Sequence, residues 1–201
     1  MTNISWIFFD IGSTLVDESP CYEIRYKETT EGTNISYQEF KDKVIELAAT
    51  SDNPYKEALQ FYGLTKTKWH KELEYPYPFT ESVLDELSKK YKLGIIANQS
   101  VGSAQRLADW GIGKYFDLVI ASAEEGVEKP NPEIFRLALE RANCLPENAV
   151  MVGDRIDNDI LPAKELGLKT ILVKQGFAKY QPESDVPDYT IQTLEEILEQ
   201  L

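Results

Sequence analysis

Five short apolar runs recur along the 201-residue chain and constrain its fold more than any other feature. Each has five or six residues, is rich in Ile and Val, and lacks the polar alternation of a strand with one wet face. Such runs are typical of strands buried on both faces of a parallel sheet. They are ISWIFF at 4–9, LGIIA at 93–97, DLVIAS at 117–122, AVMVG at 149–153 and KTILV at 169–173.

Amphipathic helical patterns accompany these runs, with apolar residues spaced to form one face of a helix. Two such faces are Val83, Leu84, Leu87 and Tyr91, and Ile134, Phe135, Ala138 and Leu139. Asn131 followed by Pro132 is a favourable N-cap and first-turn pair for the second of these helices. The alternation of strands and helices predicts a doubly wound α/β core with right-handed crossovers.

One interval, between Val16 and Phe79, has no strand-like run. It reads as polar, helix-prone sequence with amphipathic stretches at 41–50 and 55–61, and the prolines of YPYPF at 75–79 end it. We therefore predict a helical insertion of about 60 residues, with the core at 1–16 and 79–201 and a small helical domain at 17–78. Its aromatic residues are expected to form a small hydrophobic core, and some could also line a substrate pocket.

The charge and the N-terminus exclude several classes of protein. A net charge of −13 repels nucleic acid and anionic lipid. The stretch MTNISWIFFD has no basic flank and too short an apolar run for a signal peptide or a membrane span. Cys21 and Cys144 are therefore expected to be reduced thiols in a cytoplasmic protein. Nothing in the sequence predicts an oligomeric state.

Polar side chains follow four of the predicted strands. They are Asp10, Asn98 with Gln99 and Ser100, Lys129, and Asp154 with Asp157 and Asp159. Ligands of an open parallel sheet bind beyond the carboxyl ends of its strands, so these groups are expected to meet. Carboxylates suit Mg²⁺ and a lysine suits a phosphoryl group. Each of these residues, taken alone, is most simply a turn or surface residue. Their order at the ends of successive strands indicates a site for an anion and Mg²⁺.

Four segments resemble the motifs of the haloacid dehalogenase-like (HAD) superfamily: FFDIGSTLVDE, GIIANQ, GVEKPNPEIF and MVGDRIDNDILPAKELGLKTI. The resemblance covers 4–16 and the chain from about residue 79 onward, whereas 22–77 matches only in position, as a helical cap inserted after the first motif. It implies a Rossmann-like core and a hydrolase, most simply a phosphatase that acts on a small phosphorylated metabolite.

The resemblance also implies roles for individual residues. Asp10 would be the nucleophile that forms an aspartyl-phosphate, which splits one difficult displacement into two easier ones. Lys129 would hold both Asp10 and the transferring group. Asn98 and Ser100 are the candidates for further contacts to the substrate.

For Mg²⁺, the resemblance implies direct ligation by Asp10, Asp154 and the backbone carbonyl of Gly12. Asp159 would support the metal, either as a further ligand or by holding the ligands in place. Asp157 fits the family spacing less well, and we interpret it as a carboxylate favoured by a helix N-terminus.

Two positions depart from the phosphatase pattern. Gly12 stands where phosphatase members have the aspartate that protonates the leaving group, and Ala97 stands where they have a hydroxyl. The lost acid should slow turnover of poor leaving groups, because acid–base help is typically worth ~10²–10⁴-fold, and Gly12→Asp is expected to restore it. Asp17, Glu18 and His70 are candidate replacements, with Glu18 slightly better placed.

Three alternatives stay open at this point. A dehalogenase-type member would work without metal, although the acidic GDRIDND segment favours a cation. A phosphonatase-type member tolerates a small residue at position 12 and needs a Schiff-base lysine from the insertion, for which the candidates are Lys27, Lys41, Lys43 and Lys56. The third alternative is a binding or regulatory protein with an impaired site.

Overall fold

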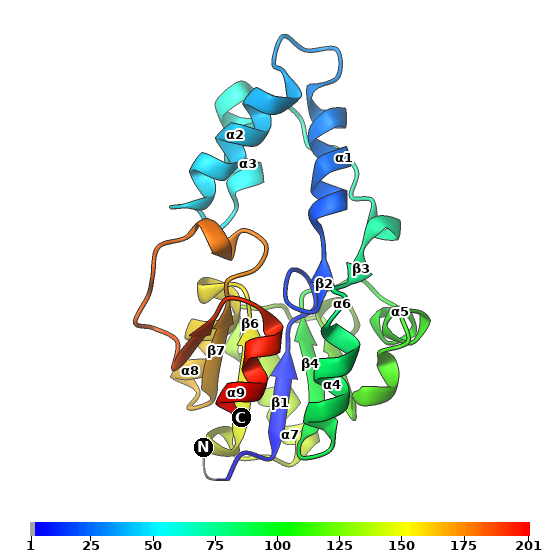
Figure 1. The fold of residues 1–201 in the computed structure, drawn as a ribbon, viewed down its shortest axis with the longest axis vertical. Helices are drawn as coiled ribbons and strands as arrows, with labels where there is room; N and C mark the ends of the chain where they lie inside the picture. Colours follow the sequence, from blue (N-terminus) through cyan, green and yellow to red (C-terminus); the bar gives the residue numbers. More distant parts are fainter. Residues whose placement is uncertain (1–2) are drawn as a thin grey trace.

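The computed structural model describes residues 3–201, and its centre is a six-stranded sheet with helices on both faces (Figure 1). The strand order is β5-β4-β1-β6-β7-β8, and every neighbouring pair is parallel. The strands are β1 (Trp6–Phe9), β4 (Lys92–Ala97), β5 (Leu118–Ala121), β6 (Ala149–Gly153), β7 (Lys169–Val173) and β8 (Tyr189–Ile191). The predicted doubly wound α/β fold is confirmed, and β8 is a strand that the apolar runs did not reveal.

The sheet is buried on both faces because successive side chains of a strand point to opposite sides. In β1, Ile7 and Phe9 belong to one fully buried cluster, whereas Phe8 between them belongs to another. The first cluster includes Leu84 from α4, and the second includes Phe135 from α7. Burying a side chain of this size contributes about 1.5–3 kcal/mol, so these apolar runs fix the position of each strand end.

The helices around the sheet are α4 (Thr80–Ser88), α5 (Ser103–Asp109), α6 (Ser122–Glu125), α7 (Pro132–Ala142), α8 (Leu161–Glu165) and α9 (Ile197–Gln200). Short turns of 3₁₀ helix occur at η1 (Lys71–Leu73), η2 (Gly113–Tyr115), η3 (Pro146–Asn148), η5 (Ala178–Tyr180) and η6 (Leu194–Glu196), and a π-helical turn at η4 (Ile156–Ile160). Helix α7 begins as predicted, because the Asn131 side chain accepts a hydrogen bond from the backbone N–H of Glu133 at 3.0 Å.

Three further helices lie beyond the carboxyl ends of the strands: α1 (Ser19–Thr30), α2 (Tyr37–Ala48) and α3 (Pro54–Tyr62) (Figure 1). We call them the outer helices. They have their own buried cluster, which includes Tyr26, Phe40 and Tyr55. The aromatic residues of this segment therefore supply a small core, as expected.

A two-stranded ribbon connects the outer helices to the sheet. Its strands, β2 (Val16–Asp17) and β3 (Tyr75–Pro76), pair antiparallel, so part of the proline-rich stretch is extended and not only a linker. The division of the chain into domains at 17–78 stays a prediction.

Two expectations from the sequence concern the cysteines and a membrane span. Cys21 and Cys144 are both free. Within residues 3–201, no helix combines the length and the apolar character that crossing a membrane would need. The cytoplasmic location itself stays a prediction.

Candidate active site

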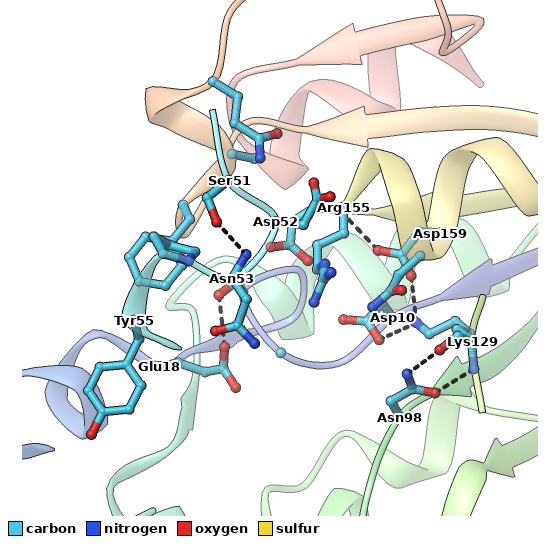
Figure 2. Close-up of a pocket in the computed structure, with 18 of the residues that line it drawn as sticks. Asp10, Glu18, Ser51, Asp52, Asn53, Tyr55, Asn98, Lys129, Arg155 and Asp159 are labelled. Atoms are coloured by element: carbon cyan, nitrogen blue, oxygen red, sulfur yellow. Dashed lines mark hydrogen bonds and ion pairs between the residues drawn. The ribbon is translucent and has the colours of Figure 1, made fainter. Parts of the chain in front are cut away.

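Four polar residues meet in one cavity of about 220 Å³ at the carboxyl edge of the sheet, and three of them directly follow central strands (Figure 2). Asp10 follows β1 directly, Asn98 follows β4, and Asp154 follows β6. Lys129 lies on the segment between α6 and α7. The backbone N–H of Asp10 still donates to the neighbouring strand, at Val152 O, so the buried sheet holds this residue rigidly.

Lys129 is the buried centre of this group. Its Nζ donates to Asp10 Oδ1 at 2.6 Å and to Asp159 Oδ1 at 2.5 Å. Asn98 holds the Lys129 backbone on both sides, donating to its carbonyl at 2.8 Å and accepting from its N–H at 2.7 Å. Burial works against the ammonium charge, but the Asp10 and Asp159 carboxylates outweigh it and raise the pKa of Lys129. The lysine is therefore a fixed positive charge beside Asp10.

Three carboxylates surround that one charge. Asp10, Asp154 and Asp159 each offer an oxygen, and these oxygens lie within 4.8 Å of one another. Burial, and then the neighbouring Asp159 and Asp10, raise the pKa of Asp154 well above its usual value. Among residues 3–201, the Asp154 side chain has no hydrogen-bond or ion-pair partner. The cluster thus has more negative charge than Lys129 neutralises, and it suits a cation of the Mg²⁺ type.

Asp159 owes its position to a glycine. A Cβ on Gly153, the last residue of β6, would collide with the Asp159 carboxyl group. With that space open, Asp159 also accepts a hydrogen bond from the Arg155 N–H at 3.0 Å through Oδ2. Burial raises its pKa to about 6, although the Lys129 charge opposes that shift.

A fourth carboxyl group lines the same cavity, that of Glu18. It accepts a hydrogen bond from Ser13 Oγ at 2.9 Å through Oε2. Burial raises the pKa of Glu18 to about 7; the Ser13 hydrogen bond lowers it and the nearby Glu74 carboxylate raises it further. Gly12 also lines the cavity, whereas the contact of its carbonyl with a metal stays a prediction.

Several residues singled out in the sequence lie elsewhere. Ser100 does not line the cavity, and its hydroxyl accepts a hydrogen bond from Arg106 at 3.4 Å. The Asp157 carboxylate pairs with Arg155 Nε at 2.9 Å. His70 contacts two glutamates outside the cavity.

The Schiff-base candidates are also absent from the cavity lining, which includes none of Lys27, Lys41, Lys43 and Lys56. Lys41 and Lys43 make ion pairs on the outer helices, with Glu23 and Glu46. The lining therefore offers no support for the phosphonatase alternative.

The sequence analysis missed the loop between α2 and α3, which reaches the cavity. Residues 51–53 of this loop and residues 54–55 at the start of α3 line the cavity, and Ser51, Asn53 and Tyr55 lie across it from Lys129 (Figure 2). Arg155 and Asn158, which follow β6, line the cavity as well. The pair Asn53 and Pro54 marks the start of α3, where Asn53 Oδ1 accepts from the Lys56 N–H at 3.1 Å. That signal predicts the turn, but the contact with the distant sheet is tertiary and has no local pattern.

Comparisons with known proteins agree with this architecture. Residues 7–173 match the family described as haloacid dehalogenase-like hydrolase. The glyceraldehyde 3-phosphate phosphatase of Methanocaldococcus jannaschii is 34% identical, over 98% of this chain and 96% of that protein. The pyrophosphatase PpaX of Bacillus velezensis is 29% identical, over 97% and 95%. The crystal structure of a HAD phosphatase from Thermococcus onnurineus superposes with a TM-score of 0.68 at 26% identity, over 98% of this chain and 97% of that one. The chain belongs to the haloacid dehalogenase-like hydrolases and is a hydrolase.

Proposed function

We propose that this hydrolase is a Mg²⁺-dependent phosphatase that releases phosphate from a small phosphorylated metabolite through a phosphorylated Asp10. The contact of Lys129 Nζ with Asp10 Oδ1 at 2.6 Å carries the proposal. It fixes one oxygen of the carboxylate, while Oδ2 has no hydrogen-bond partner among residues 3–201 and can attack phosphorus.

The donor set fits Mg²⁺. Asp154 is a buried carboxylate without a partner in the described chain, and a hard divalent cation is the partner that oxygen ligands of this kind prefer. We propose that Asp10 and Asp154 hold the ion and that Asp159 supports them. When bound, Mg²⁺ would supply positive charge that draws the phosphoryl group toward Asp10.

The reaction proceeds in two displacements. Asp10 Oδ2 attacks phosphorus, and the bond between phosphorus and the leaving oxygen breaks. Water then attacks the phosphorus of the acyl phosphate, which frees inorganic phosphate and restores Asp10. Lys129 stabilises the charge on the phosphoryl oxygens throughout, from a site that needs no reorganisation because Asn98 clamps its backbone.

The rival functions find less support. An impaired binding protein does not require Asp10, Lys129 and Asp154 to converge, and a metal-independent dehalogenase does not require an unpaired buried carboxylate. Among small phosphorylated metabolites, triose phosphates are the first to test, because a relative named as a glyceraldehyde 3-phosphate phosphatase aligns over 98% of this chain.

A screen of phosphate monoesters and acyl phosphates, with and without Mg²⁺, tests the proposal. Starting with glyceraldehyde 3-phosphate, we expect Mg²⁺-dependent phosphate release that disappears in Asp10→Asn while the melting temperature stays close to that of the wild type. Asp85→Asn is the matched control, since Asp85 is an exposed residue of α4 that pairs with Lys89. Wild-type turnover by Asp10→Asn, or no release from any ester in Mg²⁺, would overturn the proposal.

A further inference from the structure

The space beside Gly12 is already filled. A Cβ built on this glycine would lie 2.7 Å from Glu18 Oε1, 2.9 Å from Glu18 Cδ and 3.0 Å from Glu18 Oε2. All three distances are shorter than ordinary van der Waals contacts. The carboxyl group of Glu18 therefore occupies the place where the side chain of a larger residue 12 would begin.

The backbone between the two residues explains this position. After Ile11 the chain turns back on itself, because the N–H groups of Leu15 and Val16 both donate to Ile11 O, at 2.9 and 3.1 Å. The N–H of Ser13 donates to Val16 O at 2.9 Å and closes the turn. The chain then continues through β2 (Val16–Asp17), and the Glu18 side chain, which follows β2, lies beside Gly12.

A capping role does not account for Glu18. It occupies the N-cap position of α1, where a carboxylate commonly accepts a hydrogen bond from a free N–H of the first turn. No such hydrogen bond is made by its side chain. The carboxyl group instead points into the cavity that contains Asp10 and Lys129, and it is held there by Ser13 Oγ at 2.9 Å (Figure 2).

We propose that Glu18 is the acid–base residue of this site and acts from the space that a side chain at position 12 would fill. This inference rests on the proposed phosphatase function. In the first displacement, the proton of the Glu18 carboxyl group passes to the leaving oxygen as its bond to phosphorus breaks. In the second displacement, the Glu18 carboxylate takes a proton from the attacking water. The bond between phosphorus and the Asp10 oxygen breaks, which releases free phosphate and restores the Asp10 carboxylate.

This arrangement changes the expectation for Gly12→Asp. The sequence alone predicts that an aspartate at position 12 restores a missing acid. In the structure, its side chain would have to displace Glu18, so the single substitution exchanges one carboxyl group for another. The backbone of Gly12 does not lie in the left-handed region, so a side chain is excluded there by Glu18 and not by the backbone angle.

The test compares Glu18→Gln with the wild type on an alkyl phosphate and on 4-nitrophenyl phosphate, in Mg²⁺. An alkoxide needs a proton to leave, and nitrophenolate does not. We expect kcat/KM for the alkyl ester to fall ~10²–10⁴-fold and that for the aryl ester by about 10-fold or less. The variant should also accumulate phosphorylated chain, because water attack loses its base. Glu31→Gln, an exposed residue at the far end of α1, is the matched control.

A relocated acid provides the second measurement. In Gly12→Asp/Glu18→Ala the new carboxyl group has room, and we expect kcat/KM for the alkyl ester at least ~10-fold above that of Glu18→Ala. If Glu18→Gln does not fold, this comparison decides the matter. Equal kcat/KM values for Gly12→Asp/Glu18→Ala and Glu18→Ala on the alkyl ester would overturn the inference.

The experiments distinguish failure of the proposed phosphatase function from failure of the proposed role of Glu18. Turnover that depends on Asp10, together with an unchanged alkyl-to-aryl ratio in Glu18→Gln, overturns the role of Glu18 and leaves the phosphatase intact. Turnover that is the same in wild type and Asp10→Asn overturns the proposed function and this inference with it.

Discussion

Ser13 donates a hydrogen bond to Glu18 from a backbone conformation that a serine adopts only with strain: its φ is 55°, in the left-handed region. For residues with a Cβ that region costs roughly 1–2 kcal/mol. Strain of this kind clusters at functional sites, where the surrounding structure maintains it. We infer that the hydroxyl of Ser13 positions the Glu18 carboxyl group.

Ser13→Gly should therefore separate the effect of Ser13 on the position of the Glu18 carboxyl group from its effect on the stability of the protein. Glycine relieves the strain but loses more backbone entropy on folding, so we expect the free energy of unfolding to change by less than about 1 kcal/mol. With the hydroxyl gone, kcat/KM for an alkyl phosphate should fall about 10-fold while that for an aryl phosphate holds. Ser13→Ala should show the same kinetic loss with lower stability. Unchanged kinetics in both variants would contradict the positioning role.

Asp154→Asn should have opposite effects with and without metal. In EDTA the variant should melt at a higher temperature than the wild type, because it no longer buries a carboxylate that lacks a partner. In Mg²⁺ its affinity, measured by titration calorimetry, should fall about 10-fold or more. Asp157→Asn is the control, since that carboxylate pairs with Arg155. Wild-type Mg²⁺ affinity in Asp154→Asn would refute its assignment as a ligand.

Lys129→Met should be strongly destabilising. It leaves Asp10 and Asp159 buried without their cation, and removing one partner of a buried ion pair costs about 3–5 kcal/mol. Urea unfolding measures this. Lys92→Met, which removes an exposed pair with Asp117, should cost less than about 1 kcal/mol. Similar losses in the two variants would mean that Lys129 does not hold the carboxylates together.

Glu18 should also make stability depend on pH. Burial raises its pKa from 4.5 to about 7, with Glu74, Asp10 and Asp17 adding to the shift and Ser13 opposing it. As the pH rises from about 4.5 to about 7, the unfolded chain loses this proton first. The free energy of unfolding therefore falls across that window, by roughly 3 kcal/mol. In EDTA, the free energy of unfolding of Glu18→Gln should depend less on pH than that of the wild type. Parallel plots of this free energy against pH for the two proteins would contradict a raised pKa of Glu18.

The fold could be predicted where the pattern is strong. The runs at 93–97, 149–153 and 169–173 became strands because continuous burial demands continuous apolar sequence. Strand β8 (Tyr189–Ile191) escaped notice because it is a three-residue edge strand in which only Ile191 is fully buried. Helix α2 begins at Tyr37, earlier than its amphipathic stretch, because Ser36 caps it through the Glu39 N–H at 3.1 Å.

The site could be predicted only where topology dictates it. Asp10, Asn98 and Asp154 follow strands of one parallel sheet, and that fact alone brings them to one edge. The contact of Glu18 with Gly12 depends on how a six-residue turn closes, and a helix-start glutamate is common for other reasons. The reach of the α2–α3 loop depends on the packing of the outer helices, which no local pattern encodes.

The most direct test of the central claim is to identify the residue that carries the phosphoryl group. Glu18→Gln, mixed with 4-nitrophenyl phosphate and Mg²⁺ and quenched in acid, should contain an acyl phosphate. Borohydride reduces an acyl phosphate to an alcohol, so peptide mass spectrometry can locate the modified side chain. The account predicts modification at Asp10, dependent on Mg²⁺ and absent from Asp10→Asn. Modification at a residue other than Asp10 would contradict it.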